Sequence, residues 1–221
     1  MIISHTHKYV YIRPMKTASS SVESYLKKHL FNSITDEHNK LKTGLAGPHL
    51  NATQIKNGMN NDKWDAYLKM VTERNPWDKV VSLYYWEIKR QNPKIAINLN
   101  EIRNNKESAY KNFSVWFDRR VLPLKFEDVT QKNALSHRYY FIGDEFINAH
   151  FVKYENLKDD LNEFMKMIGH QLKINEFNKY NEKSGVRPKW AKDYRQFYND
   201  SQIEKIAEMC RETIKLLDYK F

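Results

Sequence analysis

Short apolar runs alternate with longer amphipathic segments along the chain. Three runs rich in β-branched and aromatic residues predict buried strands, with a weaker fourth: residues 9–12, 67–72, 149–154 and, more weakly, 139–142. Apolar residues at helical spacing follow each of the first three runs and recur near the end of the chain: residues 20–30, 77–88, 157–168 and 201–217. The polar stretch 91–112 predicts loop and short helix.

This alternation of strands and helices is typical of a three-layer α/β fold, with a central parallel sheet flanked by helices. No internal repeat or low-complexity linker stands out, so we expect a single domain over residues 1–221. Ligands of parallel sheets bind at the carboxyl ends of the strands. Residues 14–21, 73–76 and 155–156 are therefore expected along one rim.

Composition and charge narrow the class of partner. The formal net charge of +10 favours anions: a nucleic acid, a phosphorylated cofactor or an acidic glycan. The single cysteine, Cys210, excludes an intrachain disulfide, and its helical context predicts a buried, inert thiol. We find no signal-peptide pattern and no run of 18 apolar residues, so we expect a cytoplasmic protein without a membrane span.

The first chemical motif, "PMKTASSS" at residues 14–21, follows the first predicted strand. A hydroxyl-rich turn with one lysine at a helix N-terminus can hold an anion through backbone N–H groups and the helix dipole. An ATP-binding loop, GxxxxGK[ST], would carry glycines and end in lysine, whereas here Lys16 comes early and no glycine lies between residues 9 and 21. The alternative is a serine-rich cap of an ordinary helix.

The second motif, "ERNPWDKVVSLYYW", runs from the second main strand into a helix. Arg74 would stand at the strand end, with Asn75 and Pro76 starting the helix. Ser82 follows about two turns into the helix, and an arginine with a hydroxyl can cradle a second phosphate. The alternative makes Arg74 a salt-bridge partner and Ser82 a small packing residue.

Together, "YIRPMKTASSSVESYL" and "VTERNPWDKVVSLYYW" resemble the two cofactor-binding signatures of sulfotransferases that use 3′-phosphoadenosine 5′-phosphosulfate (PAPS). The likeness is strongest to the carbohydrate (heparan/chondroitin-type) branch, whose loops read PKTAGT/S and RNPxxRxxSxY. "FVKYENLKDDLNEF" is similar to that branch's R(F/Y)ENL strand and the helix after it, and the C-terminal segment is similar to the branch's closing segment. The resemblance implies a P-loop-like nucleotide-binding fold and sulfuryl transfer from PAPS to a hydroxyl, with a carbohydrate as the expected acceptor.

The resemblance also implies roles for individual residues. Lys16 would contact the phosphosulfate and stabilise the bridging oxygen as the sulfuryl group leaves. The loop that binds the 5′-phosphate would consist of Thr17, Ala18, Ser19, Ser20 and Ser21. Arg74 and Ser82 would hold the 3′-phosphate that distinguishes PAPS from ATP. We expect no metal, because neither CxxC nor HExxH occurs.

Four positions depart from the family pattern. Met15 is inserted between proline and lysine, and Ser19 replaces the usual glycine. Lys79 replaces the second arginine, and Lys153 replaces the arginine before YENL. These changes affect the expected geometry of the loops more than the expected cofactor.

Transfer to a hydroxyl needs a base, which near neutral pH is most often histidine. His49 lies 25 positions before Arg74, where the family places its catalytic histidine. The alternative is a turn histidine that caps the next helix. The other candidates for the base are the carboxylates near the rim: Glu23, Glu73 and Glu155. Of these, we expect Glu155 to have a structural role.

The basic loop at residues 181–190 is the remaining candidate. Lys183 and Arg187, together with Lys189, would close over the cofactor or meet an acidic acceptor; the alternative is a solvated loop. Two other functions compete with a sulfotransferase. A nucleic-acid-binding protein would suit the charge but lacks a recognisable binding motif, so we expect no nucleic-acid partner, and a small-molecule kinase lacks the loop glycines.

Overall fold

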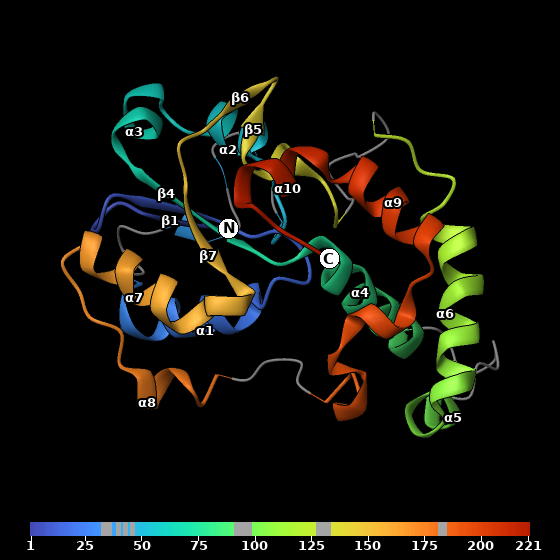
Figure 1. Ribbon diagram of the computed structural model, residues 1–221. Coiled ribbons are helices and arrows are strands. Elements are labelled where there is room, and N and C mark those ends of the chain that lie inside the picture. The colour runs from blue at the N-terminus through green and yellow to red at the C-terminus, as the bar shows by residue number, and fades with distance from the viewer. Residues whose placement is uncertain are drawn as a thin grey trace. The chain divides into compact units, whose positions relative to one another are not determined.

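The computed structural model describes residues 1–31, 37–38, 41, 44, 47–90, 99–126, 134–180 and 185–221. The chain divides into two compact units (Figure 1). Residues 1–74 and 130–182 form the first, and residues 75–129 and 183–221 form the second. The expectation of a single domain stays a prediction.

The first unit contains a five-stranded sheet in the order β3-β1-β2-β4-β7. Its strands are β1 (Ile2–Ser4), β2 (Tyr9–Ile12), β3 (Glu37–His38), β4 (Leu68–Glu73) and β7 (His150–Lys153). The strands β2, β4 and β7 are parallel, whereas β1 is antiparallel to both of its neighbours. The sheet is therefore mixed, and the expectation of an all-parallel sheet is wrong at this edge.

The antiparallel edge follows from the short connection between β1 and β2. Only residues 5–8 separate the two strands, and Lys8 reverses the chain with a φ of 52°. A connection this short can join antiparallel strands, whereas parallel strands need a long crossover. The three-residue strand β1 is too short to show a period in the sequence.

Helices α1 (Ser19–His29) and α7 (Leu157–Met167) cover one face of the sheet (Figure 1). Tyr9 and Tyr11 point to this face because alternate residues of a strand share a side. On α1, Val22, Tyr25 and Leu26 meet them at helical spacing, and all five side chains are buried. The short helix α8 (Ile174–Phe177) adds Phe177 to the same core.

Smaller elements complete the first unit. They are α2 (Ala52–Gly58), α3 (Asn61–Ala66), the 3₁₀ helices η1 (His137–Tyr139) and η2 (Tyr154–Asn156), and a separate two-stranded sheet of β5 (Phe141–Ile142) and β6 (Glu145–Phe146). The three main predicted strands are thus present within one residue of their expected bounds. The weaker run at 139–142 is a strand only in its last two residues, and it pairs outside the main sheet.

In its described residues, the second unit consists of helices joined by turns and loops, without a strand. It contains α4 (Pro76–Arg90), α5 (Leu99–Asn104), α6 (Lys106–Arg120), η3 (Lys189–Lys192), η4 (Tyr194–Phe197), α9 (Asp200–Met209) and α10 (Arg211–Leu217). Aromatic rings form its core: Phe113 lies 5.3 Å from Tyr84, 5.3 Å from Phe197 and 5.1 Å from Tyr198, between ring centroids. T-shaped contacts of this kind are favourable beyond their buried area.

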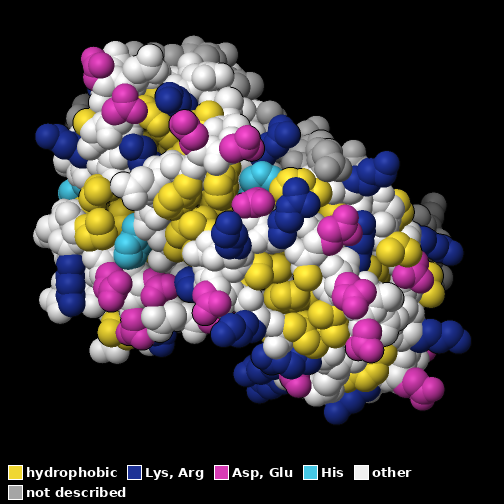
Figure 2. Space-filling model, turned by 45° about the horizontal axis from the view of Figure 1, so that its top comes forward, with side chains coloured by type: hydrophobic (Ala, Val, Ile, Leu, Met, Phe, Trp, Pro, Cys, Tyr) yellow, Lys and Arg dark blue, Asp and Glu magenta, His cyan; other side chains and the backbone are white. Residues whose placement is uncertain are grey.

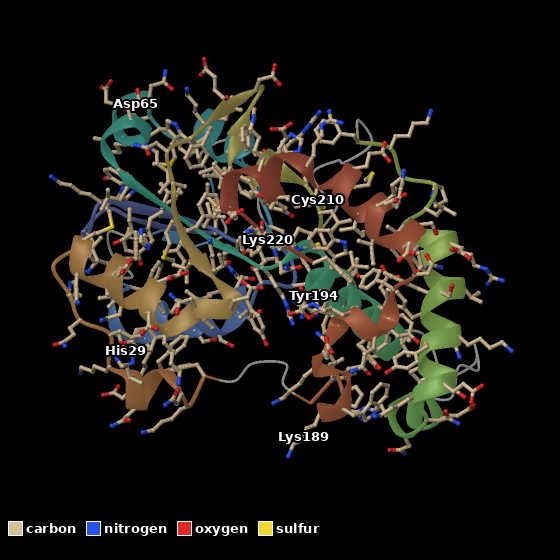
Figure 3. All side chains as sticks on the ribbon, in the orientation of Figure 1. His29, Asp65, Lys189, Tyr194, Cys210 and Lys220 are labelled. Atoms are coloured by element: carbon tan, nitrogen blue, oxygen red, sulfur yellow. The ribbon has the colours of Figure 1, made fainter. Side chains whose placement is uncertain are left out.

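Two expectations for this unit need correction. The stretch 91–112 was expected to be loop and short helix, and of this stretch residues 91–98 lie outside the described residues. The short helix α5 agrees with the expectation, yet residues from Lys106 belong to the 15-residue helix α6. Its buried side chains, Ala109, Phe113, Trp116 and Phe117, form an apolar stripe that is diluted by polar neighbours. The expected helix 201–217 is divided at Cys210, which leaves helical geometry with φ −112° and ψ 18°. The Cys210 side chain is buried, as predicted (Figure 3).

Charged side chains of both signs are interspersed on the face drawn in Figure 2, without one continuous basic patch there. The Lys and Arg side chains that are visible on this face are therefore spread over it rather than gathered. None of the helices in the described ranges combines the length and the apolar character needed to cross a membrane.

Candidate functional site

The parallel register brings the ends of three strands together in the first unit. Ile12 pairs with Val71, and Glu73 pairs with Lys153. Neighbouring strands lie about 4.8 Å apart. The loop after β2, Arg74 after β4 and Tyr154 after β7 consequently lie along one edge of the sheet, as expected for strands of an α/β protein.

The loop between β2 and α1, residues 13–18, has an unusual backbone. Lys16 and Ala18 both adopt left-handed conformations, with φ values of 65° and 60°. This geometry costs an L-residue about 1–2 kcal/mol, and such strain concentrates at binding sites. Left-handed residues next to a helix N-terminus are the backbone form that turns N–H groups toward an anion.

The start of α1 adds to this electrostatic character. Ala18 is the N-cap residue and has no side-chain oxygen to accept from the first turn, which also contains no acidic residue. The positive end of the helix dipole is therefore not offset by a carboxylate of its own first turn. Lys16, Ala18 and Ser20 are half-buried, and Ser19 and Ser21 are buried.

Thr17 differs from the other residues of the loop because its side chain points into the protein. It is fully buried, donates to the carbonyl of Pro14 over 3.0 Å, and lies 2.8 Å from the hydroxyl oxygen of Thr72 on β4. The Thr17 hydroxyl thus connects the loop to the sheet, and only its backbone N–H is left for an expected phosphate contact.

Arg74 lies at the end of β4 and is 7% exposed. Its backbone N–H donates to a carboxylate oxygen of Glu73 over 2.8 Å, and its guanidinium carbon lies 3.8 Å from the centre of the Tyr154 ring. Cation–π stacking uses the face of the guanidinium, while its N–H donors lie in the plane and suit an oxyanion. The contact with Tyr154 was not expected, although an aromatic residue directly after the third strand is a signal in the sequence.

His49 lies beside the start of the loop. Its Nδ1 is 2.7 Å from the carbonyl oxygen of Arg13. Because a carbonyl only accepts, Nδ1 is the donor, and Nε2 carries the lone pair in the neutral imidazole. Asn51, not His49, caps the helix that follows, through a capping box with Gln54. The capping alternative for His49 is therefore wrong.

The carboxylates that were considered as alternative bases occupy other environments. Glu23 forms an ion pair with the buried Arg13, and Glu73 is fully buried. Glu155 is exposed. The structural role expected of Glu155 stays a prediction. At the same strand end, the Asp160 carboxylate accepts from the backbone N–H of Lys153 over 2.8 Å.

Asp160 was missed by sequence reasoning. Its second oxygen accepts from the side-chain amide of Asn156 over 2.6 Å, and its carbonyl lies 3.0 Å from Nε2 of His150. The residue therefore holds the end of β7 and the turn that carries Tyr154. An aspartate in the first turn of a helix is the signal that was available.

The remaining predicted residues belong to the second unit or are not described. Ser82 is half-buried on α4. Arg187 forms an ion pair with Asp78 at the start of α4 and donates to the carbonyl of Lys192 over 3.0 Å. Lys183 lies outside the described residues, and Lys189 is exposed on η3 (Figure 3). The guanidinium of Arg187 is thus bound internally, and its cofactor contact stays a prediction.

Burial keeps two tyrosines near the strand ends protonated. It raises the pKa of Tyr11, and burial together with the Glu73 carboxylate raises the pKa of Tyr139. Both hydroxyls therefore remain hydrogen-bond donors at neutral pH. In the part of the chain that the structure describes, no group of three His, Cys, Asp or Glu side chains is arranged to hold a metal ion.

The chain is similar in sequence to an archaeal protein. A protein of Archaeoglobus fulgidus, described as an uncharacterized protein, is 32% identical over 119 residues, which cover 53% of this chain and 81% of the archaeal one. The two proteins belong to one family. No family model matches the chain, and no solved structure matches it. The relative's description assigns no activity.

Proposed function

We propose that the protein is a sulfotransferase that moves a sulfuryl group from PAPS to a hydroxyl of a carbohydrate acceptor, on a P-loop-like nucleotide-binding fold. One observation carries the proposal: a left-handed, lysine-bearing loop at the start of α1 and a buried arginine stand at the ends of adjacent parallel strands. An adenosine with phosphate groups at both ends needs two anion sites of this kind.

Each anion site suits one end of the donor. Backbone N–H groups of the loop and of the first turn of α1 would hold the 5′-phosphosulfate, with Lys16 directed to its bridging oxygen. Arg74 would hold the 3′-phosphate, because stacking on Tyr154 fixes the guanidinium plane without using its N–H donors. Ser82 belongs to the second unit, and its expected contact with the 3′-phosphate stays a prediction.

The transfer step follows from these positions. The acceptor oxygen bonds to sulfur while the bond from sulfur to the bridging oxygen breaks, and its electron pair leaves with adenosine 3′,5′-bisphosphate. Lys16 stabilises the charge that develops on the bridging oxygen. The acceptor proton passes to Nε2 of His49, whose ring is oriented by the hydrogen bond from Nδ1 to Arg13.

Ligand binding tests the proposal first. Adenosine 3′,5′-bisphosphate at a hundredfold its Kd should stabilise the protein by about 2.7 kcal/mol, measured as a shift in Tm, while ATP should not. Arg74→Ala should abolish this shift, and Arg195→Ala, which removes an exposed arginine, should retain it. A shift with ATP alone would indicate a kinase, and salt-sensitive DNA binding without any bisphosphate shift would indicate a nucleic-acid-binding protein.

Turnover tests the chemistry. With sulfur-labelled PAPS and a panel of carbohydrate acceptors, Lys16→Ala should lower kcat far more than it weakens bisphosphate binding. Lys28→Ala removes an exposed lysine of α1 and serves as the matched control. Equal losses of kcat and of bisphosphate affinity in Lys16→Ala would contradict its role at the bridging oxygen.

A further inference from the structure

Three buried hydroxyl groups form a chain beneath the loop that precedes α1. Tyr11 on β2 lies 3.3 Å from the carbonyl of Ser19 and 3.2 Å from the hydroxyl of Thr72 on β4. Thr72 lies 2.8 Å from Thr17, which donates to the carbonyl of Pro14 over 3.0 Å. The Tyr11, Thr17 and Thr72 side chains are fully buried, so no solvent competes for these hydrogen bonds.

The directions of these hydrogen bonds follow from counting protons. Three hydroxyls supply three protons for four oxygen–oxygen contacts, and the carbonyls at the two ends only accept. Tyr11 and Thr17 therefore donate outward to the carbonyls, and Thr72 donates to one of these two neighbours. The shorter contact assigns its proton to Thr17. Thr72 on β4 therefore holds the loop through its hydrogen bond to Thr17, and its 3.2 Å contact with Tyr11 carries no proton of its own. Tyr11 on β2 holds the loop through the carbonyl of Ser19.

The two carbonyls at the ends of the chain enclose the strained part of the loop. Pro14 and Ser19 flank the two left-handed residues, Lys16 and Ala18. A loop that carries strain of this kind persists only where its surroundings hold it. Hydrogen bonds that fix the two flanking carbonyls to β2 and β4 restrict the conformations that the residues between them can adopt.

We propose that the Tyr11–Thr72–Thr17 hydroxyl chain is a positioning device that holds the loop at residues 14–19 in its anion-binding conformation before the donor arrives. Thr72 acts through Thr17 and touches neither donor nor acceptor. The inference rests on the proposed function for the identity of the anion, adenosine 3′,5′-bisphosphate or PAPS. The ordering of the loop, which is the structural part of the inference, does not rest on the proposed function.

Two variants at one position separate the hydroxyl from its volume. Thr72→Val keeps the shape and leaves Tyr11 and Thr17 their carbonyl acceptors, so the protein should fold. Thr72→Ser restores the hydroxyl. Loss of a buried hydrogen bond should weaken bisphosphate binding in Thr72→Val by about fivefold to tenfold, and Thr72→Ser should return it to the wild-type value. Tyr11→Phe, at the other end of the chain, should weaken binding in the same direction.

Hydrogen exchange of the loop amides, measured by mass spectrometry without ligand, gives the second readout. Faster exchange at residues 14–21 in Thr72→Val, and wild-type exchange in Thr72→Ser, are expected. Leu161→Ala, which creates a cavity in the core of the first unit, controls for general loss of stability and should not speed exchange selectively in the loop.

The outcomes distinguish the two proposals. If the wild-type protein does not bind the bisphosphate but the loop still loosens in Thr72→Val, the proposed donor is wrong and the positioning role stands. If Thr72→Val matches the wild type in loop exchange, or if Thr72→Ser behaves like Thr72→Val, the positioning role is overturned. Unchanged affinity in Thr72→Val despite a looser loop also overturns it.

Discussion

Replacing Ala18 by glycine should stabilise the protein, although glycine usually weakens a helix. Ala18 has φ 60° and ψ 14°, a conformation that costs an L-residue about 1–2 kcal/mol and costs glycine nothing. Glycine adds freedom to the unfolded chain, which offsets about 0.4–1 kcal/mol of this gain. At an N-cap, glycine is also preferred over alanine. The balance is a gain of about 1 kcal/mol in the free energy of unfolding, or about 2–4 °C in Tm for a chain of this size.

Urea denaturation followed by circular dichroism measures this change, together with thermal unfolding. Ala207→Gly is the matched control, because Ala207 is half-buried within the right-handed helix α9. It should lose about 1 kcal/mol, the ordinary cost of glycine in a helix interior. A loss of stability in Ala18→Gly equal to that in Ala207→Gly would refute the left-handed conformation of residue 18, and with it the pre-shaped anion loop.

Stability and affinity should change in opposite directions in this variant. A more flexible residue at position 18 increases the conformational entropy that the loop loses when it binds an anion. Ala18→Gly should therefore unfold at a higher temperature and bind adenosine 3′,5′-bisphosphate more weakly. Parallel gains in both would show that the left-handed strain has no part in binding.

Three other predictions test the base, the second unit and the response to pH. His49→Ala should retain bisphosphate binding while lowering transfer by about 10²–10⁴-fold; activity at the wild-type level would exclude His49 as the base. Asp78→Ala should cost about 3 kcal/mol in urea unfolding because it leaves Arg187 charged and buried, and adding Arg187→Ala should cost less than the sum of the two single changes. Burial and the neighbouring His7 lower the pKa of His170 below its ordinary 6.5, so the folded state favours the neutral ring and stability should fall as pH drops through 6.5. His170→Gln should weaken this dependence in unfolding experiments between pH 8 and 5, and an unchanged slope would contradict it.

Strong local patterns gave the parts of the fold that sequence reasoning predicted. The run at 9–12 has the same bounds as β2, and a proline at the first helical position marked the start of α4. Segments with weak local patterns were missed. β1 has only three residues, and the apolar stripe of α6 is interrupted by Lys111, Asn112 and Ser114. Tertiary packing, rather than local preference, fixes these elements.

The candidate site, like the fold, could be predicted in part from local patterns in the sequence. Its motifs follow strand ends, so the loop after β2 and Arg74 could be located from the order of elements. Contacts between residues that are distant in sequence could not be predicted in this way. The sequence does not indicate that His49 meets Arg13, 36 positions away, or that Arg187 meets Asp78, 109 positions away. Choosing one partner among 37 lysines and arginines requires the folded chain.

Asp160 influences the proposed anion site through the backbone of β7. By accepting a hydrogen bond from the backbone N–H of Lys153, Asp160 fixes the end of β7 and thus the position of the Tyr154 ring. Tyr154 in turn orients Arg74. The orientation of the Arg74 guanidinium therefore depends on the first turn of α7, and a mutational survey of the proposed site should include Asp160.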